Sequence, residues 1–112
     1  MRVAMALLCF VLATEVAAPA FAHKPSLQEC FEGGDFIANA ALARDNGITR
    51  SAFVDRLVAD IALIQAFPAP LRWFVVDPDD ALFLHAEVSR VFDTPSSPEA
   101  HRAQFLSRCF DR

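Results

Sequence analysis

No segment of this 112-residue sequence is apolar for long enough to span a lipid bilayer. The longest apolar run covers residues 3–13, whereas a transmembrane helix needs about 20 apolar residues. The sequence also lacks a surplus of positive charge, because 10 Lys and Arg residues stand against 14 Asp and Glu residues and give a net charge of −4. Proteins that bind nucleic acid or anionic membrane surfaces present a basic face. The composition therefore argues against a stable membrane anchor and against a nucleic-acid partner.

Motifs of catalysis and cofactor binding are also missing. The cysteines lack the C-x-x-C spacing of redox-active or metal-binding pairs, and there is no G-x-S-x-G nucleophile elbow. The acidic cluster of Asp77, Asp79 and Asp80 lacks the glycine and the distal Glu of a calcium-binding loop. His85 and His101 each lie at or beside the apolar stripe of an expected helix, where a structural histidine is the commoner case. We therefore expect neither an enzyme nor a cofactor.

The first 22 residues have the three-part layout of a secretory signal peptide. One positive charge precedes the apolar run, and the segment ends with Ala20-Phe21-Ala22, which places small residues at positions −3 and −1 of a cleavage site. Cleavage after Ala22 makes His23 the new N-terminus. We therefore expect a signal peptide at 1–22 and a periplasmic or secreted single domain at 23–112.

The mature chain has two cysteines, Cys30 and Cys109, which lie near its two ends. A pair of this kind in an exported protein usually forms a disulfide, because the compartment is oxidising. The loop that a bond between these two cysteines closes is long, and closing it stabilises a fold by roughly 4 to 4.5 kcal/mol in the chain-entropy account. A domain of this size buries little surface and benefits from such a staple. We expect a structural disulfide between these cysteines.

Helix signals dominate the mature chain. Apolar residues recur at helical spacing in four stretches that are separated by capping residues, glycine and proline. We expect helices that begin after Ser26, Thr49 and Asp77 and in the segment 93–98, the first ending at Asn46-Gly47 and the second at Phe67. The sequence therefore predicts an all-α fold, a small four-helix bundle whose first and last helices are joined by the disulfide.

Two details of these helices are specific enough to test. Gly33-Gly34 interrupts the first helix, and it predicts either a kink or a close contact with another helix. The last helix has an expected apolar stripe of Ala103, Leu106, Cys109 and Phe110, with Phe105 beside it.

The segment 66–76 is the least ordinary part of the chain. Pro70 can start a short helix, and Val75-Val76 can equally form a short extended piece, so both alternatives stay open. Aromatic residues on a connecting segment are often interface anchors, although they can also close a small core. The residues of a possible interaction surface are Leu71, Trp73 and Phe74, together with the acidic turn Asp77, Asp79 and Asp80.

Three short motifs resemble a set of uncharacterised small exported helical proteins of Gram-negative bacteria. These motifs are Ala-Arg-Asp-Asn-Gly at 43–47, Phe-Pro with Leu-Arg-Trp-Phe-Val at 67–75, and Val-Phe-Asp-Thr-Pro at 91–95. The resemblance covers most of the mature chain and implies no function. In architecture alone, the chain also resembles periplasmic acid-stress chaperones and type VI immunity proteins, and a likeness of architecture transfers no site.

These observations lead to three functional expectations. The first is a non-enzymatic periplasmic protein-interaction module, with a protein as partner and an oligomeric state that the sequence leaves open. The second is an acid-stress or folding chaperone, in which acid protonates the carboxylates, His85 and His101 and loosens the bundle. The third is copper binding through the α-amine and the imidazole of His23, which is the one metal candidate.

Overall fold

The structure, a computed structural model, describes residues 23–112; the expected signal peptide lies outside the described residues. Residues 23–112 form four helices and one short 3-10 turn: α1 (Leu27–Asp45), α2 (Arg50–Ile64), η1 (Ala69–Leu71), α3 (Pro78–Asp93) and α4 (Pro98–Phe110). The predicted all-α bundle is confirmed. In the part of the chain that the structure describes, no helix is both long and apolar enough to cross a membrane.

Each helix begins at a residue that the sequence identified as a cap. The side chains of Ser26, Thr49, Asp77 and Ser97 accept hydrogen bonds from the backbone of the first turns. Gly47 ends α1 with a φ of 92°, a left-handed conformation that glycine adopts without a steric penalty. α2 ends at Ile64 rather than at the expected Phe67, because the N–H groups of Ala66 and Phe67 already make tighter i→i−3 bonds before Pro68.

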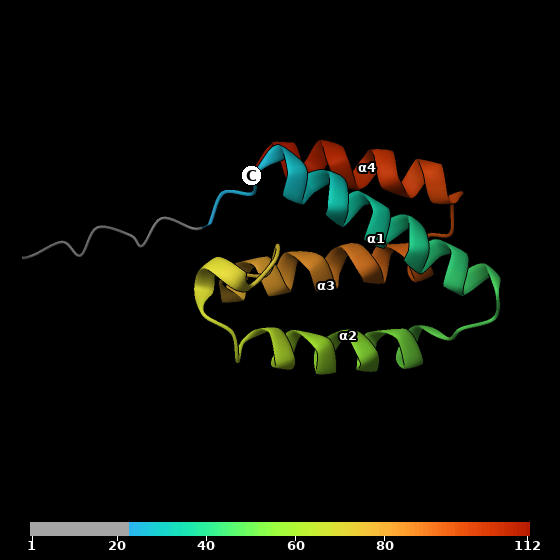
Figure 1. Ribbon diagram of the computed structural model, residues 1–112. Helices are drawn as coiled ribbons and strands as arrows, with labels where there is room; N and C mark the ends of the chain where they lie inside the picture. Colours follow the sequence, from blue (N-terminus) through green and yellow to red (C-terminus); the bar gives the residue numbers. More distant parts are fainter. Residues whose placement is uncertain (1–22) are drawn as a thin grey trace, which may run out of the picture.

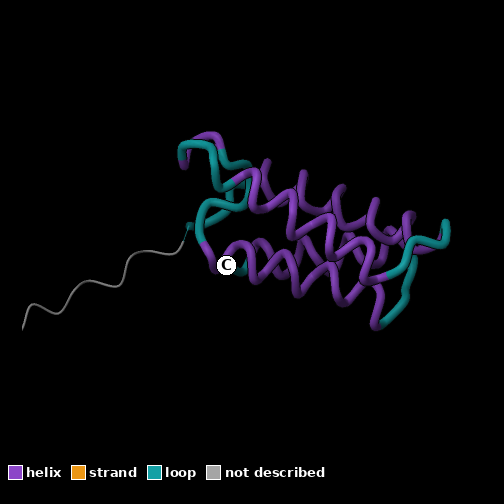
Figure 2. Tube along the Cα trace, turned by 90° about the horizontal axis from the view of Figure 1, so that it is seen from below, coloured by secondary structure: helices purple, strands orange, loops and turns teal. Residues whose placement is uncertain are grey.

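The four helices form a bundle with α2 at its edge (Figure 1). α1 packs against α4 and also against α3, and α2 packs mainly against α3. α3 and α4 are in direct contact as well, since the rings of Phe83 and Phe105 lie 5.6 Å apart. α1 and α4 run antiparallel, so that the start of α1 and the C-terminus lie at one end of the bundle (Figure 2). The predicted disulfide is confirmed at this end, where Cys30 and Cys109 are bonded and almost completely buried.

The core lies between α1, α3, α4 and the connector between α2 and α3, which is residues 65–77. Its centre is an aromatic cluster in which the rings of Phe74, Phe83 and Phe105 lie 5.6 to 6.0 Å apart. Gly33 faces this cluster, and a Cβ atom added there would lie 2.5 Å from Cζ of Phe105. The predicted close helix contact at Gly33-Gly34 is therefore confirmed.

The buried face of α4 differs from the predicted stripe. His101, Phe105 and Cys109 are its buried residues, at spacings of four, whereas Phe110 is 44% exposed and Ala103 is also exposed. The prediction is confirmed for Cys109 and for Leu106, which packs against the core, and it was wrong for Ala103 and Phe110 because it followed hydrophobicity alone. α4 turns one continuous face toward α1 and α3, and a hydrogen-bonded histidine is part of that face.

Candidate functional site

The acidic turn of the predicted interaction surface lies beside His23, at the end of the bundle where the described chain begins. The backbone N of His23 donates to Oδ2 of Asp77 over 2.9 Å, and its Nδ1 lies 2.9 Å from Oδ2 of Asp80. Its Nε2 lies 3.4 Å from Oε1 of Glu29 on α1. The fold therefore brings together His23 and the acidic turn, which are more than 50 residues apart in the sequence.

Asp80 is a completely buried carboxylate at the centre of this site. It accepts hydrogen bonds from the backbone N–H groups of Val76 and Asp77, and Nη1 of Arg112 lies 2.8 Å from its Oδ1. A buried charge is tolerated only with such compensation. Asp80 therefore belongs to the core, which corrects its expected place on an interaction surface.

Asp77 combines the cap of α3 with the contact to His23. The pKa of Asp77 is lowered, first by the hydrogen bond from the His23 backbone, against some desolvation that raises it. The N–H groups of Asp80 and Asp79 and the charge of Arg112 lower the pKa further. Asp77 is half-buried, and Asp79 is the exposed member of the acidic turn.

The connector presents Leu71 to solvent and turns Phe74 inward. Leu71 is 68% exposed, whereas Phe74 is completely buried, so Phe74 also has to be removed from the predicted surface. Trp73 is half-buried, and its indole N–H donates to Oε2 of Glu32 over 2.9 Å. Its φ of 31° is a sparsely populated conformation for a bulky residue. Pro70 lies in the 3-10 turn, and Val75-Val76 is irregular backbone without strand pairing.

The connector and the N-terminal segment line a hollow of about 400 Å³. Its lining residues are His23, Glu29, Ala69, Pro70, Trp73 and Val76. One wall is therefore proline and tryptophan, and the other is imidazole and carboxylate. This hollow joins three features that the sequence singled out separately: the cleavage site, the proline-rich segment and the tryptophan.

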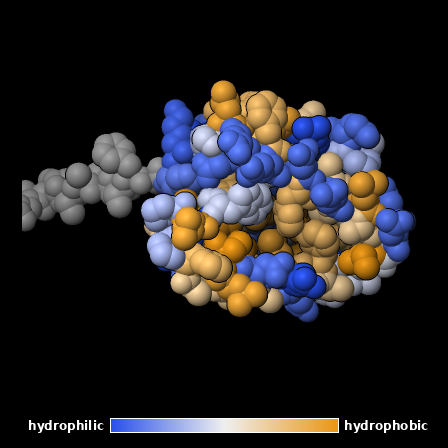
Figure 3. Space-filling model, viewed as in Figure 1, coloured by the Kyte–Doolittle hydropathy of each residue, from blue (hydrophilic) through white to orange (hydrophobic). Residues whose placement is uncertain are grey.

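A groove between α2 and α3 has a largely apolar lining, and it was not predicted from the sequence. It has a volume of about 400 Å³ and is lined by Val58, Ile61, Pro78, Ala81, Leu82 and His85. Leu82 is 69% exposed and Val58 is 54% exposed. Figure 3 shows hydrophobic residues that reach the surface between charged ones on one face of the bundle. The sequence signal was present, since both residues lie outside the buried stripes of their helices.

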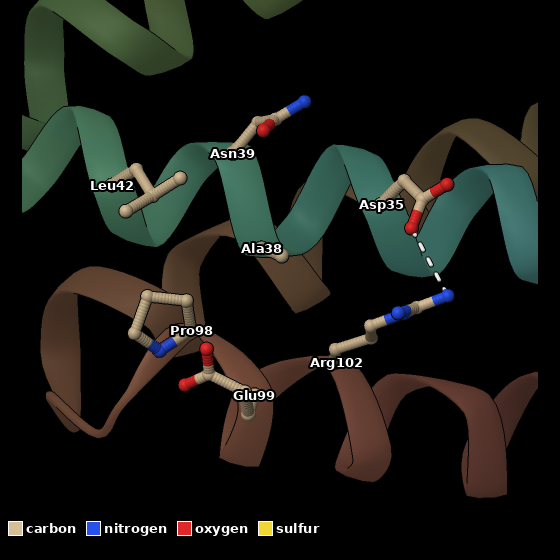
Figure 4. Close-up of a pocket in the computed structure, with 7 residues that line it drawn as sticks. All are labelled: Asp35, Ala38, Asn39, Leu42, Pro98, Glu99 and Arg102. Atoms are coloured by element: carbon tan, nitrogen blue, oxygen red, sulfur yellow. Dashed lines mark ion pairs between the residues drawn. The ribbon is translucent and has the colours of Figure 1, made fainter.

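A third hollow, of about 380 Å³, lies between α1 and α4 (Figure 4). Asp35 on α1 and Arg102 on α4 form an ion pair of 3.1 Å across it. Leu42 and Pro98 face one another at one end, whereas Asn39 points away from α4. The lining carries two carboxylates, Asp35 and Glu99, against one guanidinium, and it holds no Ser, Cys or His side chain beside them. This hollow therefore suggests no chemistry.

His101 is a structural histidine that joins α4 to the ends of α1 and α3. Its Nε2 accepts from the backbone N–H of Ser96 over 3.0 Å and lies 3.3 Å from Nη1 of Arg44. The same guanidinium donates to the carbonyl oxygens of Val91 and Ser96, over 2.7 Å in each case. The pKa of His101 is lowered, first by burial and then by the charges of Arg44 and Arg108. The imidazole is therefore held in its neutral form.

A second buried carboxylate, Glu87, was not predicted either. Arg108 on α4 donates to both of its oxygens, over 2.6 Å in each case, and this joins α4 to α3. Glu87 is 3% exposed. Its position beside Leu84 and Val88 on the buried face was the only hint in the sequence.

Comparison with known protein families, curated proteins and solved structures found no match to this chain. Within residues 23–112, no three His, Cys, Asp or Glu side chains are arranged to hold a metal ion. Copper binding through His23 remains a prediction.

Proposed function

We propose that this protein is a non-enzymatic interaction protein of the periplasm and that its partner is another protein. The compartment is supported by the signal-peptide pattern of residues 1–22 and by the Cys30–Cys109 disulfide, since disulfides persist in oxidising compartments. The observation that carries the interaction is the open apolar groove between α2 and α3, in which His85 is the one polar residue.

The packing of α2 supports this choice of surface. Leu57 is the one residue of this 15-residue helix that is buried in the described chain. Val58 on one wall of the groove and Leu82 on the other remain more than half exposed. Fully burying a Val or Leu side chain contributes about 1.5–3 kcal/mol, and we expect about 1–2 kcal/mol from each of these partly exposed residues.

The occupant that fits the groove best is an amphipathic helix of the partner. α2 and α3 run antiparallel beside the groove (Figure 1), and laying the apolar face of a third helix between two such helices is a common recognition mode. The lining holds no Asp, Glu, Lys or Arg side chain that would oppose apolar side chains.

The connector is the alternative surface for the same function. It exposes Leu71 beside the hollow, and the strained backbone of Trp73 is a feature that functional segments often show. The two surfaces make different predictions for single substitutions, which allows one experiment to decide between them.

Three leucines of nearly equal exposure provide the experiment. Leu82 lies in the groove, Leu71 in the connector, and Leu63 on α2 outside the groove lining; their exposed fractions are 69%, 68% and 67%. Each is replaced separately by Gln, and in the two helices Gln keeps nearly the same helix propensity as Leu. The exported variants carry one photo-crosslinker at a fixed exposed position such as Asp79, and adducts are compared with the wild type.

We expect Leu82→Gln to lose a discrete protein adduct that Leu63→Gln and Leu71→Gln keep. Loss with Leu71→Gln alone would move the surface to the connector. Equal adducts from all four chains would contradict an interaction at either surface. Circular dichroism of each variant confirms that the fold is intact.

A second candidate function, an acid-stress chaperone, is supported by a contact between helices that needs a neutral imidazole. Acid would protonate His101, whose Nε2 accepts a hydrogen bond from the backbone N–H of Ser96. This protonation removes the hydrogen bond at the start of α4 and favours loosening of the bundle and exposure of the aromatic core. The test is suppression of aggregation of a model substrate at low pH. A chain that stays folded and inactive near pH 3 contradicts this function.

A further inference from the structure

Three carboxylates surround His23 at the end of the bundle. Oδ2 of Asp77 and Oδ2 of Asp80 each lie 2.9 Å from one of its nitrogen atoms, the backbone N and Nδ1, and Oε1 of Glu29 lies 3.4 Å from Nε2. Its side chain is only 21% exposed. The carboxylates therefore bind His23 of the same chain at two places, its backbone nitrogen and its imidazole ring.

We infer that the carboxylate site at the start of α3 is a receptor for the α-ammonium group of the processed N-terminus. In the precursor, the backbone nitrogen of His23 is a peptide N–H that can donate one hydrogen bond. Cleavage after Ala22 converts the same nitrogen into a charged amine, 2.9 Å from the carboxylate of Asp77. Signal cleavage then creates an ion pair that completes the fold. The inference rests on the predicted cleavage but does not depend on the proposed partner.

The charges around the site leave a place for this ammonium group. The charge of Asp80 is already compensated, because Nη1 of Arg112 lies 2.8 Å from its Oδ1. Asp77 forms no ion pair with a Lys or Arg side chain in the described chain, although it is half-buried. The group that cleavage charges is the nitrogen of His23, so the new charge appears beside a carboxylate whose other cationic neighbour, Arg112, is paired with Asp80.

The position of this ion pair gives it a structural effect beyond the N-terminus. Asp77 caps α3 and follows the buried residues Phe74 and Val75 of the connector. His23 precedes α1 by four residues and also contacts Glu29 on that helix. The ammonium group therefore ties the N-terminal segment and α1 to the connector and α3, beside the hollow that Trp73 lines.

The experiment compares two chains that differ by one residue. The first is the exported protein, whose intact mass shows whether it begins at His23. The second is the same oxidised protein with Ala22 retained, which moves the charged amine one residue away and restores a peptide N–H at His23. Each chain is made with Asp77 and with Asp77→Asn, and Asn keeps the capping of α3 because Asn and Asp are equally good N-caps. Asp79→Asn, an exposed change in the same turn, is the control for the charge of the helix terminus.

We expect retention of Ala22 to raise the unfolding equilibrium constant about threefold or more, the range of an ion pair that is partly shielded from solvent. The two changes should be coupled, so that Asp77→Asn weakens the mature chain more than the extended one. Asp79→Asn should affect both chains equally. Equal stability of the two chains, or equal effects of Asp77→Asn in both, would overturn the inference. A mass that does not begin at His23 would refute the cleavage instead, and the synthetic mature chain would still test the ion pair.

The pH dependence provides a second readout. Asp77 contacts the nitrogen that becomes the amine, Asp80 and Glu29 contact the imidazole of His23, and Arg112 contacts Asp80. Asp, Glu and Arg side chains do not ordinarily titrate between pH 7 and 10, and an imidazole ordinarily titrates below this range. The chain has no tyrosine, its two mature cysteines are bonded, and an α-amine ordinarily loses its proton near pH 7.7–8.0. Pairing favours the charged amine in the folded state, so its contribution is present below that range and is lost as the pH rises. The difference between the two chains should therefore vanish by about pH 10, and a difference that persists there would contradict an ion pair.

Discussion

Gly33 and Gly34 of α1 are adjacent, but they meet neighbours of different stiffness on α4. A Cβ atom at Gly33 would lie 2.5 Å from Cζ and 2.7 Å from Cε1 of Phe105, whose ring is completely buried and packed against two other rings. A Cβ atom at Gly34 would lie 3.2 Å from Cδ2 of Leu106 and 3.3 Å from Cγ of Arg102. These flexible side chains can shift by a few tenths of an ångström, whereas the phenylalanine ring has no free space to enter.

The two alanine substitutions should therefore change stability in opposite directions. Replacing Gly by Ala inside a helix stabilises it by about 1 kcal/mol. Overpacking a rigid core costs about 1–3 kcal/mol. For Gly34→Ala the helix gain dominates, and we expect stability between unchanged and about 1 kcal/mol higher. For Gly33→Ala the clash dominates, and we expect a loss of about 1–2 kcal/mol.

Urea unfolding of the oxidised mature chain measures both changes. Fluorescence of Trp73, the single tryptophan, reports on the core end of the bundle, and circular dichroism reports on the helices. Coincident transitions by the two probes are the condition for comparing free energies. Equal stability of the two variants, or a more stable Gly33→Ala, would refute the close approach of α1 and α4 on which this reasoning depends.

Three further predictions concern the links between helices. Replacing both Cys30 and Cys109 by Ala should lower the free energy of unfolding by about 4 kcal/mol in the chain-entropy account, because the bridge joins residues 79 apart; a loss below 1 kcal/mol in urea unfolding would contradict it. Arg108→Met leaves the carboxylate of Glu87 buried without its bidentate partner and should lower the free energy of unfolding by about 2–3 kcal/mol. Arg102→Met on the same helix removes an exposed ion pair and should lower it by less than about 1 kcal/mol. Similar losses of stability in the two variants would refute the assigned burial of Glu87. The pKa of His101 is lowered, so the neutral form stabilises the fold, and this contribution is present above about pH 6.5 and is lost as the pH falls. We expect wild-type stability to fall between pH 7 and pH 5 by more than that of His101→Gln, and parallel curves would contradict this role.

The parts of the fold that follow from local sequence were predicted correctly. The capping boxes of α1 and α3 need only residues three apart, and Gly47 needs only its own conformational freedom. The disulfide was predictable because the mature chain has two cysteines and no other pairing is possible. The caps and Gly47 depend on neighbouring residues, and the disulfide followed because only one pairing was possible. None of these predictions required knowledge of how the helices pack.

Apart from the end of α2, whose cause is local, the errors concern residues whose environment is decided by distant parts of the chain. Asp80 and Glu87 are acidic, and their burial depends on Arg112 and Arg108, which only the folded chain brings to them. Phe74 could face either a partner or the core, and its contact with Phe105 decides for the core.

Surface features that join distant parts of the chain could not be predicted from the sequence either. Leu82 is exposed on α3, and an exposed leucine becomes informative only when the opposite wall of a groove is known. The contact between His23 and Asp77 spans 54 residues and has no signal in the local sequence.

The position of the disulfide also determines how the domain responds to force. Cys30 and Cys109 close a covalent ring that contains α2, α3 and almost all of α1 and α4. Tension applied at residues 23 and 112 passes through the sulfur atoms, and between these two points it can extend only residues 23–29 and 110–112. An unfoldase that pulls a single polypeptide through its pore would have to pass two polypeptide segments at once when it reached the disulfide-closed ring. The oxidised domain is therefore mechanically locked from its ends, and reduction is the step that would release it.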